Sequence, residues 1–328
     1  MKKLLLETGI HRDGLSLLAG QVEVIGPIPD HAKVREILRG GVHGLITSSA
    51  LPVTEELMAS APLLEAVGRP GVGVDNVDLA GATNQGVLVV YTPDAPTEST
   101  AEHAVALMLA LAKQVRPGDI TIRAAGFKHR REYVGVELLG KTLGVVGLGR
   151  IGRRVAEICG KGLGMRVLAF DPYLTAAQAQ ALGVEPRAEL ESVVREADFL
   201  TVHTPLTEGT RGLIGARELA LMKPTAYLIN VARGPIVDEG ALLETLRARR
   251  IAGAGLDVFD VEPIPFPHPL LELDNVVLTP HLASFTEDGN RKMGVGVAEQ
   301  MLKALAGERP DFLANPPVWA RGTRVKAP

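Results

Sequence analysis

The stretch "GVVGLGRIG", from Gly144 to Gly152, contains the feature that decides the fold. Apolar residues typical of a β-strand lead into it, and an amphipathic helical pattern follows. Gly147, Gly149 and Gly152 form G-x-G-x-x-G, in which the glycines permit a tight turn, a close backbone approach to a ligand, and close packing of helix on strand. Because a helix N-terminus also offers free N–H groups, the stretch predicts a cradle for the pyrophosphate of a dinucleotide.

This motif lies in the middle of a 328-residue chain, long enough for two domains. The residues ahead of it alternate short apolar runs with helical patterns, which predicts a small α/β domain with a mostly parallel sheet. We expect strands at 4–7, 22–26, 44–48, 64–68 and 87–92, and helices at 30–40 and 53–60.

A long helical pattern at 97–115 precedes the second domain, and a charged segment at 123–142 follows it. That segment fits an arm packed on a partner subunit and a solvated surface loop about equally well. From residue 142 on, strands and helices alternate again, which indicates a doubly wound βαβ series. We expect strands at 142–149, 165–171, 198–205, 226–232, 251–259 and 275–283, and helices at 150–162, within 175–195, near 216–222 and at 239–250. A last helical pattern at 285–308 is compatible with a return to the first domain, and residues 321–328 resemble a frayed tail.

Composition excludes several classes of function. The formal net charge of −3 leaves no basic excess for nucleic acid. The single Cys159 cannot form an internal disulfide, so we expect a reducing, cytoplasmic compartment and a small buried thiol. The apolar run that begins the chain stops at Glu7, too short for a secretory signal, and no apolar run reaches about 18 residues, so we expect no membrane span. We expect no metal.

Asp171 stands at the end of the strand that follows the glycine motif, about 20 residues on, where an acid commonly binds the ribose hydroxyls of NAD. A carboxylate there repels the 2′-phosphate of NADP, so the sequence predicts NAD. The competing interpretation is a simple turn residue ahead of Pro172.

Three charged or titratable residues follow predicted strands, at the edge where open α/β sheets bind ligands. They are Arg233 in "NVARGPIVDEGAL", Glu262 in "AGLDVFDVEP" and His281 in "TPHLAS". An arginine can grip a carboxylate, a histidine can exchange a proton near neutral pH, and a carboxylate beside it favours the imidazolium. Each alone could be a surface or core residue, but together they indicate hydride chemistry at a carbonyl.

These stretches, with "VGRPGVGVDNVDL", "TAEHAVALMLALA", "FDPY" and "VHTPLT", resemble the D-isomer-specific 2-hydroxyacid dehydrogenase family over nearly the whole chain. Phosphoglycerate dehydrogenase and glyoxylate/hydroxypyruvate reductase are the most similar branches. The resemblance implies a Rossmann-type NAD-binding domain (99–285) inserted into a flavodoxin-like substrate domain (1–98 and 286–328). It also implies a homodimer or homotetramer formed through the NAD-binding domain.

By the same resemblance, Arg233 orients the substrate, His281 is the acid/base and Glu262 supports it. The implied cofactor-binding residues are Thr100, Gly147, Gly149, Arg150, Ile151, Gly152, Asp171, His203, Thr204, Pro205, Val231, Ala232 and Asp257, the last at the nicotinamide end. The implied substrate-binding residues are Ser48, Val72, Gly73, Arg233 and His281.

The chain departs from the phosphoglycerate branch at Ser48, where those enzymes carry an arginine. Arg130 and Arg131 could replace this base or reach a neighbouring active site, although a solvated charge run fits them better. The chain also ends without a regulatory small-molecule-binding domain, so we do not expect serine feedback. Glyoxylate, hydroxypyruvate and 3-phosphoglycerate all stay open as substrates. There are two alternatives: an NAD-sensing interaction protein of the same fold, or an enzyme that oxidises another small anion such as phosphite. Formate is disfavoured because formate enzymes carry Gln where Glu262 stands.

Overall fold

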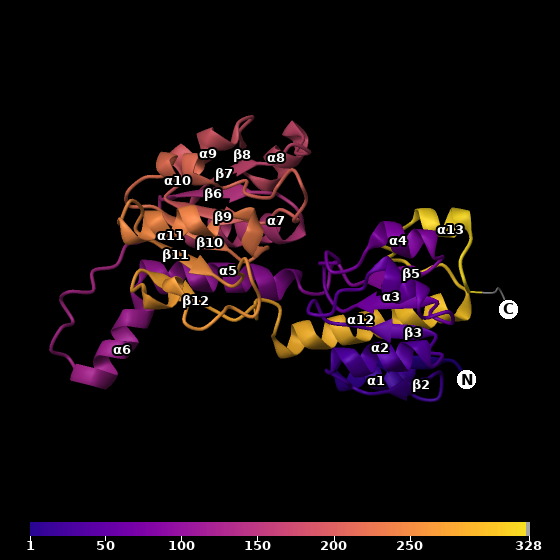
Figure 1. Ribbon diagram of the computed structural model, residues 1–328. Coiled ribbons are helices and arrows are strands. Elements are labelled where there is room, and N and C mark those ends of the chain that lie inside the picture. The colour runs from indigo at the N-terminus through magenta and orange to yellow at the C-terminus, as the bar shows by residue number, and fades with distance from the viewer. Residues whose placement is uncertain (326–328) are drawn as a thin grey trace. The chain divides into compact units, whose positions relative to one another are not determined.

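The chain folds into two compact units, each built on a parallel sheet (Figure 1). The structure, a computed structural model, describes residues 1–325. Unit 1 comprises Met1–Pro96 with Ser284–Pro328, and unit 2 comprises Thr97–Ala283. The α/β fold expected from the alternating pattern is confirmed in both.

Unit 1 has five parallel strands in the order β2-β1-β3-β4-β5, which is the flavodoxin-like order. The strands are β1 (Lys3–Leu6), β2 (Glu23–Ile25), β3 (Gly44–Ile46), β4 (Ala66–Arg69) and β5 (Leu88–Tyr91). The helices are α1 (Arg12–Leu18), α2 (His31–Arg39), α3 (Glu55–Ala59), α4 (Leu79–Asn84), α12 (Glu287–Ala306) and α13 (Pro317–Arg321).

Both faces of this sheet are buried, because successive side chains of a strand point to opposite faces. Leu5 belongs to the core formed with α2, α3 and α4, whereas Leu4 and Leu6 belong to the core formed with α1 and α12. Helix α12 lies against α1 so closely that a Cβ on Gly14 would fall 2.3 Å from the carbonyl oxygen of Gly294. The C-terminal helical pattern therefore completes unit 1.

Unit 2 has seven parallel strands in the order β12-β11-β10-β9-β6-β7-β8, a Rossmann order with one added edge strand. The strands are β6 (Thr142–Val146), β7 (Arg166–Phe170), β8 (Glu185–Pro186), β9 (Phe199–Val202), β10 (Tyr227–Asn230), β11 (Gly253–Leu256) and β12 (Val276–Leu278). The helices are α5 (Thr97–Ala112), α6 (Val115–Ala125), α7 (Arg150–Glu157), the π-helix η1 (Ile158–Gly162), α8 (Ala176–Leu182), α9 (Leu190–Glu196), α10 (Ala216–Leu221), η2 (Gly234–Ile236), α11 (Glu239–Arg247) and η3 (Pro269–Glu272).

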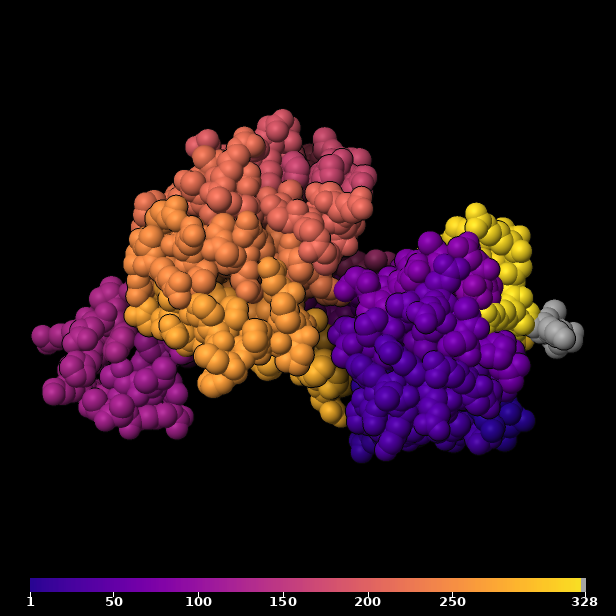
Figure 2. All heavy atoms as spheres, viewed as in Figure 1, coloured from indigo at the N-terminus to yellow at the C-terminus, as the bar shows by residue number. Residues whose placement is uncertain are grey.

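Most of the charged segment predicted at 123–142 falls in a projecting arm, residues 115–134, that begins with α6 (Figures 1 and 2). No residue of α6 is buried. The arm leaves unit 2 after α5 and returns where Val136 N donates to Ala112 O at 2.8 Å. A hydrogen bond from Thr121 Oγ1 to Tyr133 OH, 2.6 Å long, joins its two halves.

The predicted frayed tail at 321–328 is wrong as far as residue 325. Arg324 Nη1 donates to the carbonyl oxygens of Met58, Ala61 and Leu64, and its Nη2 donates to Gln85 Oε1. Val325 is buried as well. One arginine thus satisfies carbonyls at the end of a helix and its following turn, which composition alone does not reveal. Residues 326–328 lie outside the described part of the chain.

The expectations for the single cysteine, for two strands and for a membrane span had different outcomes. Cys159 is buried in η1, and desolvation raises the pKa of its thiol to about 12, so the expected structural cysteine is confirmed. The pattern at 251–259 is a strand only over Gly253–Leu256, and the two-residue β8 at the sheet edge was not anticipated. Among residues 1–325, no helix is long and apolar enough to cross a bilayer.

Candidate active site

The glycine motif forms the turn between β6 and α7, as its spacing predicts. Gly147 has φ +91°, and a Cβ on it would lie within 2.9 Å of the backbone of His203 and Thr204. A Cβ on Gly152 would fall 2.1 Å from Gly147 O. These two glycines are therefore required by the packing of the turn itself.

Gly149 is different, because no atom lies within 4 Å of a Cβ built on it. It is the N-cap of the eight-residue helix α7, so the N–H groups of the first helical turn lie next to this open position. A side chain here would fill space that the protein leaves open. This arrangement fits the pyrophosphate of a dinucleotide.

Asp171 follows β7 directly and contacts this turn. Its Oδ2 accepts a hydrogen bond from Leu148 N at 2.7 Å, and its Oδ1 accepts one from Tyr173 N at 2.8 Å. The carboxylate therefore acts as a turn residue, as the competing interpretation held, and also lies beside the glycine cradle. Each oxygen retains lone-pair capacity for a ribose hydroxyl, so the two interpretations are compatible.

His203 and Thr204 follow β9 on the other side of the glycine turn. His203 Nε2 and Thr201 Oγ1 are 2.8 Å apart, and desolvation lowers the pKa of His203 to about 3, which keeps the ring neutral. Thr204 Oγ1 is buried and has no hydrogen-bond partner among the described residues. A buried hydroxyl left over at this turn is a group that a bound ligand can satisfy.

The remaining residues expected near the dinucleotide occupy several elements of unit 2. Arg150 and Ile151 begin α7, and Thr100 is buried in α5. Pro205 follows β9, whereas Val231 and Ala232 follow β10. No contact among the described residues tests their role, so their binding of the cofactor stays a prediction.

The structure brings His281 and Glu262 into direct contact. His281 Nδ1 lies 2.5 Å from Glu262 Oε2, and about a third of each side chain is exposed (34% and 33%). Burial alone would raise the pKa of Glu262, but the hydrogen bond and charge of His281, the Phe259 N–H and the charge of Arg233 together hold that pKa below its usual value. The carboxylate is therefore ionised at neutral pH.

Arg233 follows β10, Glu262 follows β11 and His281 follows β12, and these three strands are neighbours in the sheet. Because the strands are parallel, their carboxyl ends lie on one edge. Asn230, 1% exposed, shapes the turn that carries the arginine: its Nδ2 donates to Arg233 O at 2.9 Å and its Oδ1 accepts from Ala232 N at 3.0 Å. Sequence reasoning missed this asparagine, although its place at a strand end was a usable signal.

Asp257 is fully buried and holds the segment that carries His281. Its Oδ1 accepts from Thr279 Oγ1 (2.6 Å) and Leu282 N (2.9 Å), and its Oδ2 accepts from Ala283 N (2.9 Å). His281 has φ +52°, a strained value for a non-glycine residue, and its N–H donates to Asp257 O at 2.8 Å. The expected contact of Asp257 with nicotinamide stays a prediction, while its observed contacts are those of a positioning residue.

His103 of α5 extends this network, since its Nε2 lies 3.0 Å from Thr279 Oγ1 and 3.5 Å from Asp257 Oδ1. Neither His103 nor Thr279 was singled out from the sequence. Their motifs, "TAEH" and "LTPH", were visible, but only the fold shows that the two meet.

The expected substrate-binding residues of unit 1 lie after β3 and β4, which are adjacent parallel strands. Ser48 follows β3, and Val72 and Gly73 follow β4, with Val72 exposed. Asn76 Nδ2 donates to Ser48 O at 3.0 Å and to Leu51 O at 2.7 Å, which ties the two loops together. Their role in substrate binding stays a prediction.

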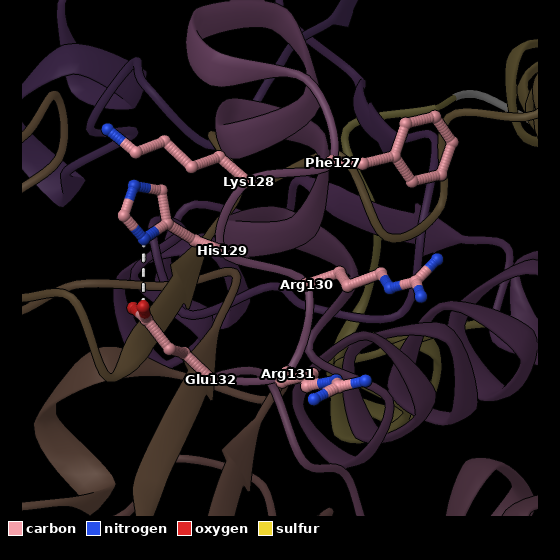
Figure 3. A pocket seen from close by; sticks show the side chains of 6 residues that line it. All are labelled: Phe127, Lys128, His129, Arg130, Arg131 and Glu132. Atoms are coloured by element: carbon pink, nitrogen blue, oxygen red, sulfur yellow. Dashed lines mark hydrogen bonds and ion pairs between the residues drawn. The ribbon is translucent and has the colours of Figure 1, made fainter.

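Arg130 and Arg131 lie in the arm, in a pocket lined by residues 127–132 alone (Figure 3). His129 Nδ1 and Glu132 Oε1 are 2.8 Å apart there, and the two arginines point away from that pair. None of the predicted catalytic residues lines this pocket.

The chain belongs to the D-isomer specific 2-hydroxyacid dehydrogenase family, whose NAD binding domain matches residues 105–283. It is 41% identical to D-3-phosphoglycerate dehydrogenase of Methanocaldococcus jannaschii over 97% of this chain. The chain spans 49–60% of the length of the curated relatives it matches.

Solved structures agree with this family. A protein from Thermus thermophilus is similar at 36% identity and TM-score 0.88, covering 95% of this chain and 99% of its own. An NADPH-dependent glyoxylate/hydroxypyruvate reductase from Sinorhizobium meliloti is similar at 32% identity and TM-score 0.84, covering 96% and 98%. These comparisons confirm three predictions from the sequence: the family, the Rossmann domain and NAD as the ligand of that domain.

Proposed function

We propose that this protein is an NAD-dependent oxidoreductase that interconverts a small 2-keto acid and a D-2-hydroxy acid. One observation carries the proposal. His281 and Glu262 lie 2.5 Å apart, beside Arg233 at one sheet edge. The chemistry that bound NADH supplies is a hydride for the carbonyl carbon.

His281 moves the proton in this scheme. Its Nδ1 is engaged by the ionised Glu262, so Nε2 is the atom that gives a proton to the carbonyl oxygen, or removes one from the hydroxyl in the reverse direction. Glu262 keeps the ring oriented and stabilises the imidazolium. Arg233 binds the substrate carboxylate and aligns the carbonyl.

Asp171 favours NAD over NADP, because its carboxylate beside the glycine cradle would repel a 2′-phosphate. The similarity to an NADPH-dependent reductase does not decide the cofactor of this chain, since the two share 32% identity. The relatives include a D-3-phosphoglycerate dehydrogenase and a glyoxylate/hydroxypyruvate reductase, so phosphoglycerate, glyoxylate and hydroxypyruvate are the substrate candidates.

The test is NADH oxidation with glyoxylate, hydroxypyruvate, phosphohydroxypyruvate and pyruvate, followed by absorbance. His281→Ala should retain NADH binding and lose turnover by a factor on the order of 100 or more. His43→Gln, on the N-terminal side of β3, is the matched control and should turn over normally. Normal turnover by His281→Ala would remove it from the mechanism.

Arg233→Ala should lower kcat/KM for every 2-keto acid, and an unchanged value would exclude its role. NADH binding without turnover of any 2-keto acid would favour the alternatives of the same fold, an NAD-sensing protein or an NAD-dependent enzyme that oxidises phosphite. Oxidation of phosphite with NAD would separate those two.

We also propose a homo-oligomer formed through unit 2. Val115, Ile120, Phe127 and Val134 of the arm are each more than half exposed. Several exposed apolar side chains on one projecting element are typical of a protein interface. Light scattering should show a dimer or tetramer, and Ile120→Glu should shift it toward monomer; a monomeric wild type would contradict the proposal.

We also propose a cytoplasmic location, which is consistent with the single thiol. Cell fractionation tests this location.

A further inference from the structure

A proline-rich loop of unit 2 carries Glu262 between β11 and η3. From Asp257 to Pro269 it reads "DVFDVEPIPFPHP", with prolines at 263, 265, 267 and 269. Because proline has no backbone N–H, this stretch has few donors with which to hold its own backbone. The direction of the Glu262 side chain therefore depends on the contacts that other elements make with the loop.

Glu239 binds this loop on both sides of Glu262. Its Oε2 accepts a hydrogen bond from Asp260 N at 3.2 Å, and its Oε1 lies 3.3 Å from His268 Nε2. The side chains of Glu239 and His268 are 22% and 16% exposed, so water competes little for their contact. One carboxylate thus brings the two ends of the loop together, as in an Ω-loop.

The ring of His268 is set for this contact. Its Nδ1 accepts a hydrogen bond from Leu270 N at 3.4 Å, at the N-cap of η3. A neutral imidazole that accepts at one nitrogen carries its proton on the other, so Nε2 donates to Glu239. One ring nitrogen therefore caps η3, and the other holds the loop.

Glu239 is the first residue of α11 and is not needed to cap that helix. Asp238 is the N-cap, and its Oδ1 accepts from Ala241 N at 2.9 Å. An acid in the first turn is also favoured by the helix dipole. The helix therefore presents the Glu239 carboxylate to the loop from a fixed position.

The loop also presses on the turn that carries Arg233. A Cβ on Gly234 would fall 2.0 Å from the carbonyl carbon and oxygen of Phe259 and 2.6 Å from Asp260 N. The glycine permits this close approach of two backbones. The backbone group that Glu239 binds therefore lies where the turn of Arg233 meets the loop.

Two consecutive backbone N–H groups connect Glu239 with the catalytic pair. Asp260 N donates to Glu239, and Phe259 N donates to Glu262 Oε1 at 3.0 Å, while the other oxygen of Glu262 contacts His281. Without its bond to Glu239, this stretch of backbone is free to turn, and the Glu262 carboxylate loses its fixed direction.

We propose that Glu239 is a positioning residue, which acts through the loop to hold the Glu262 carboxylate against His281. This inference rests on the proposed function. Packing of Phe259 in the apolar core fixes where the loop begins, whereas the side chain of Glu262 is a third exposed. The hydrogen bonds of Glu239 supply the order that this packing does not.

The first test replaces Glu239 with alanine. Glu239→Ala should lower kcat for keto-acid reduction by about fivefold or more and leave KM and the Kd of NADH within about twofold. Glu244→Ala, which removes an exposed acid from the same helix, is the matched control and should leave kcat unchanged. An unchanged kcat for Glu239→Ala would overturn the inference.

A double-mutant cycle separates positioning from general stability. In a Glu262→Ala background there is no carboxylate to position, so Glu239→Ala should change kcat by less than about twofold. A purely structural role would lower kcat by the same factor in both backgrounds, and that result would overturn the inference.

Two variants of His268 keep the test open if Glu239→Ala does not fold. His268→Gln places an amide near the position of Nε2 and keeps a donor for Glu239, whereas His268→Asn places one near Nδ1 and keeps only the cap of η3. We expect His268→Asn to lose kcat as Glu239→Ala does, and His268→Gln to resemble the wild type. The reverse order would show that the cap, and not Glu239, holds the loop.

Hydrogen exchange reports on the loop independently of turnover. By mass spectrometry, the peptide that covers 257–268 should exchange faster in Glu239→Ala than in the wild type, while β6 (Thr142–Val146) should exchange at the same rate in both. Equal exchange of the loop in both proteins would overturn the inference. If no 2-keto acid is turned over at all, the proposed function fails, and the exchange rates still decide whether Glu239 holds the loop.

Discussion

His281 Nδ1 and Glu262 Oε2 lie 2.5 Å apart, at the ends of two adjacent parallel strands. The two residues are 19 positions apart in sequence and meet because β11 and β12 pair in register. The contact fixes which ring nitrogen holds a proton permanently and which exchanges one. It also pairs the imidazolium with an ionised partner, since His281 and Arg233 help to keep the pKa of Glu262 below its usual value.

Glu262→Gln should therefore lower kcat/KM for keto-acid reduction by roughly tenfold or more at pH 7. The ionised carboxylate orients the imidazole and lies beside it, and the amide keeps the shape without the charge. Steady-state rates at pH 7 measure the loss. Glu244→Gln, an exposed acid on α11, serves as the control. An unchanged kcat/KM would show that Glu262 has no electrostatic role in turnover.

The loop that carries His281 gives a second prediction. Thr279→Val removes the hydroxyl that joins His103 to the buried Asp257 and leaves that carboxylate short of one donor. An unsatisfied buried group costs about 1–3 kcal/mol, so Tm should fall. The strained φ of His281 should relax, which lowers kcat more than it changes KM.

Thr279→Ser keeps the hydroxyl and should restore kcat. NADH affinity, measured by fluorescence, should stay within threefold in both variants. Equal kcat values for the valine and serine variants would show that the network stabilises the fold without positioning His281.

The sequence predicted what depends on local pattern. Short apolar runs, glycine spacing and the position of a residue just after a strand are all local, and they were sufficient to predict two parallel sheets and the glycine turn. Asp171 was placed beside the turn for the same reason. The pairing of Glu262 with His281 was implied by the family resemblance.

The residues that were missed depend on contacts between distant segments. His103 and Thr279 are 176 positions apart, and Arg324 caps carbonyls more than 230 positions away. Glu7 was interpreted only as the end of an apolar run, because its partner Ser48 lies 41 positions on. Such pairs follow from strand order and register, which a single sequence does not specify.

Asp171→Ser should narrow the preference for NADH over NADPH by tenfold or more, because it removes the charge that repels a 2′-phosphate while keeping an oxygen for the Leu148 and Tyr173 N–H groups. Kinetics with both cofactors at one substrate concentration measure the ratio. Glu189→Gln, an exposed acid ahead of α9, should leave it unchanged. A wild type equally active with NADPH would show that Asp171 is a turn residue only.

His203 gives a prediction about stability, because burial lowers its pKa from 6.5 to about 3 in the folded protein. Below pH 6.5 the unfolded chain binds a proton that the folded chain excludes, so stability is present above about pH 6.5 and is lost as the pH falls toward 3.

His203→Gln keeps a partner for Thr201 and cannot bind that proton. Its Tm should therefore fall less steeply than that of the wild type between pH 6.5 and pH 4, measured by circular dichroism at constant ionic strength. His129→Gln, whose side chain is 39% exposed in the arm, is the matched control and should follow the wild type. Parallel curves for all three proteins would mean that His203 takes up its proton in the folded state as readily as in the unfolded one. That result would contradict the prediction that burial lowers the pKa of His203 and keeps its ring neutral beside the glycine turn.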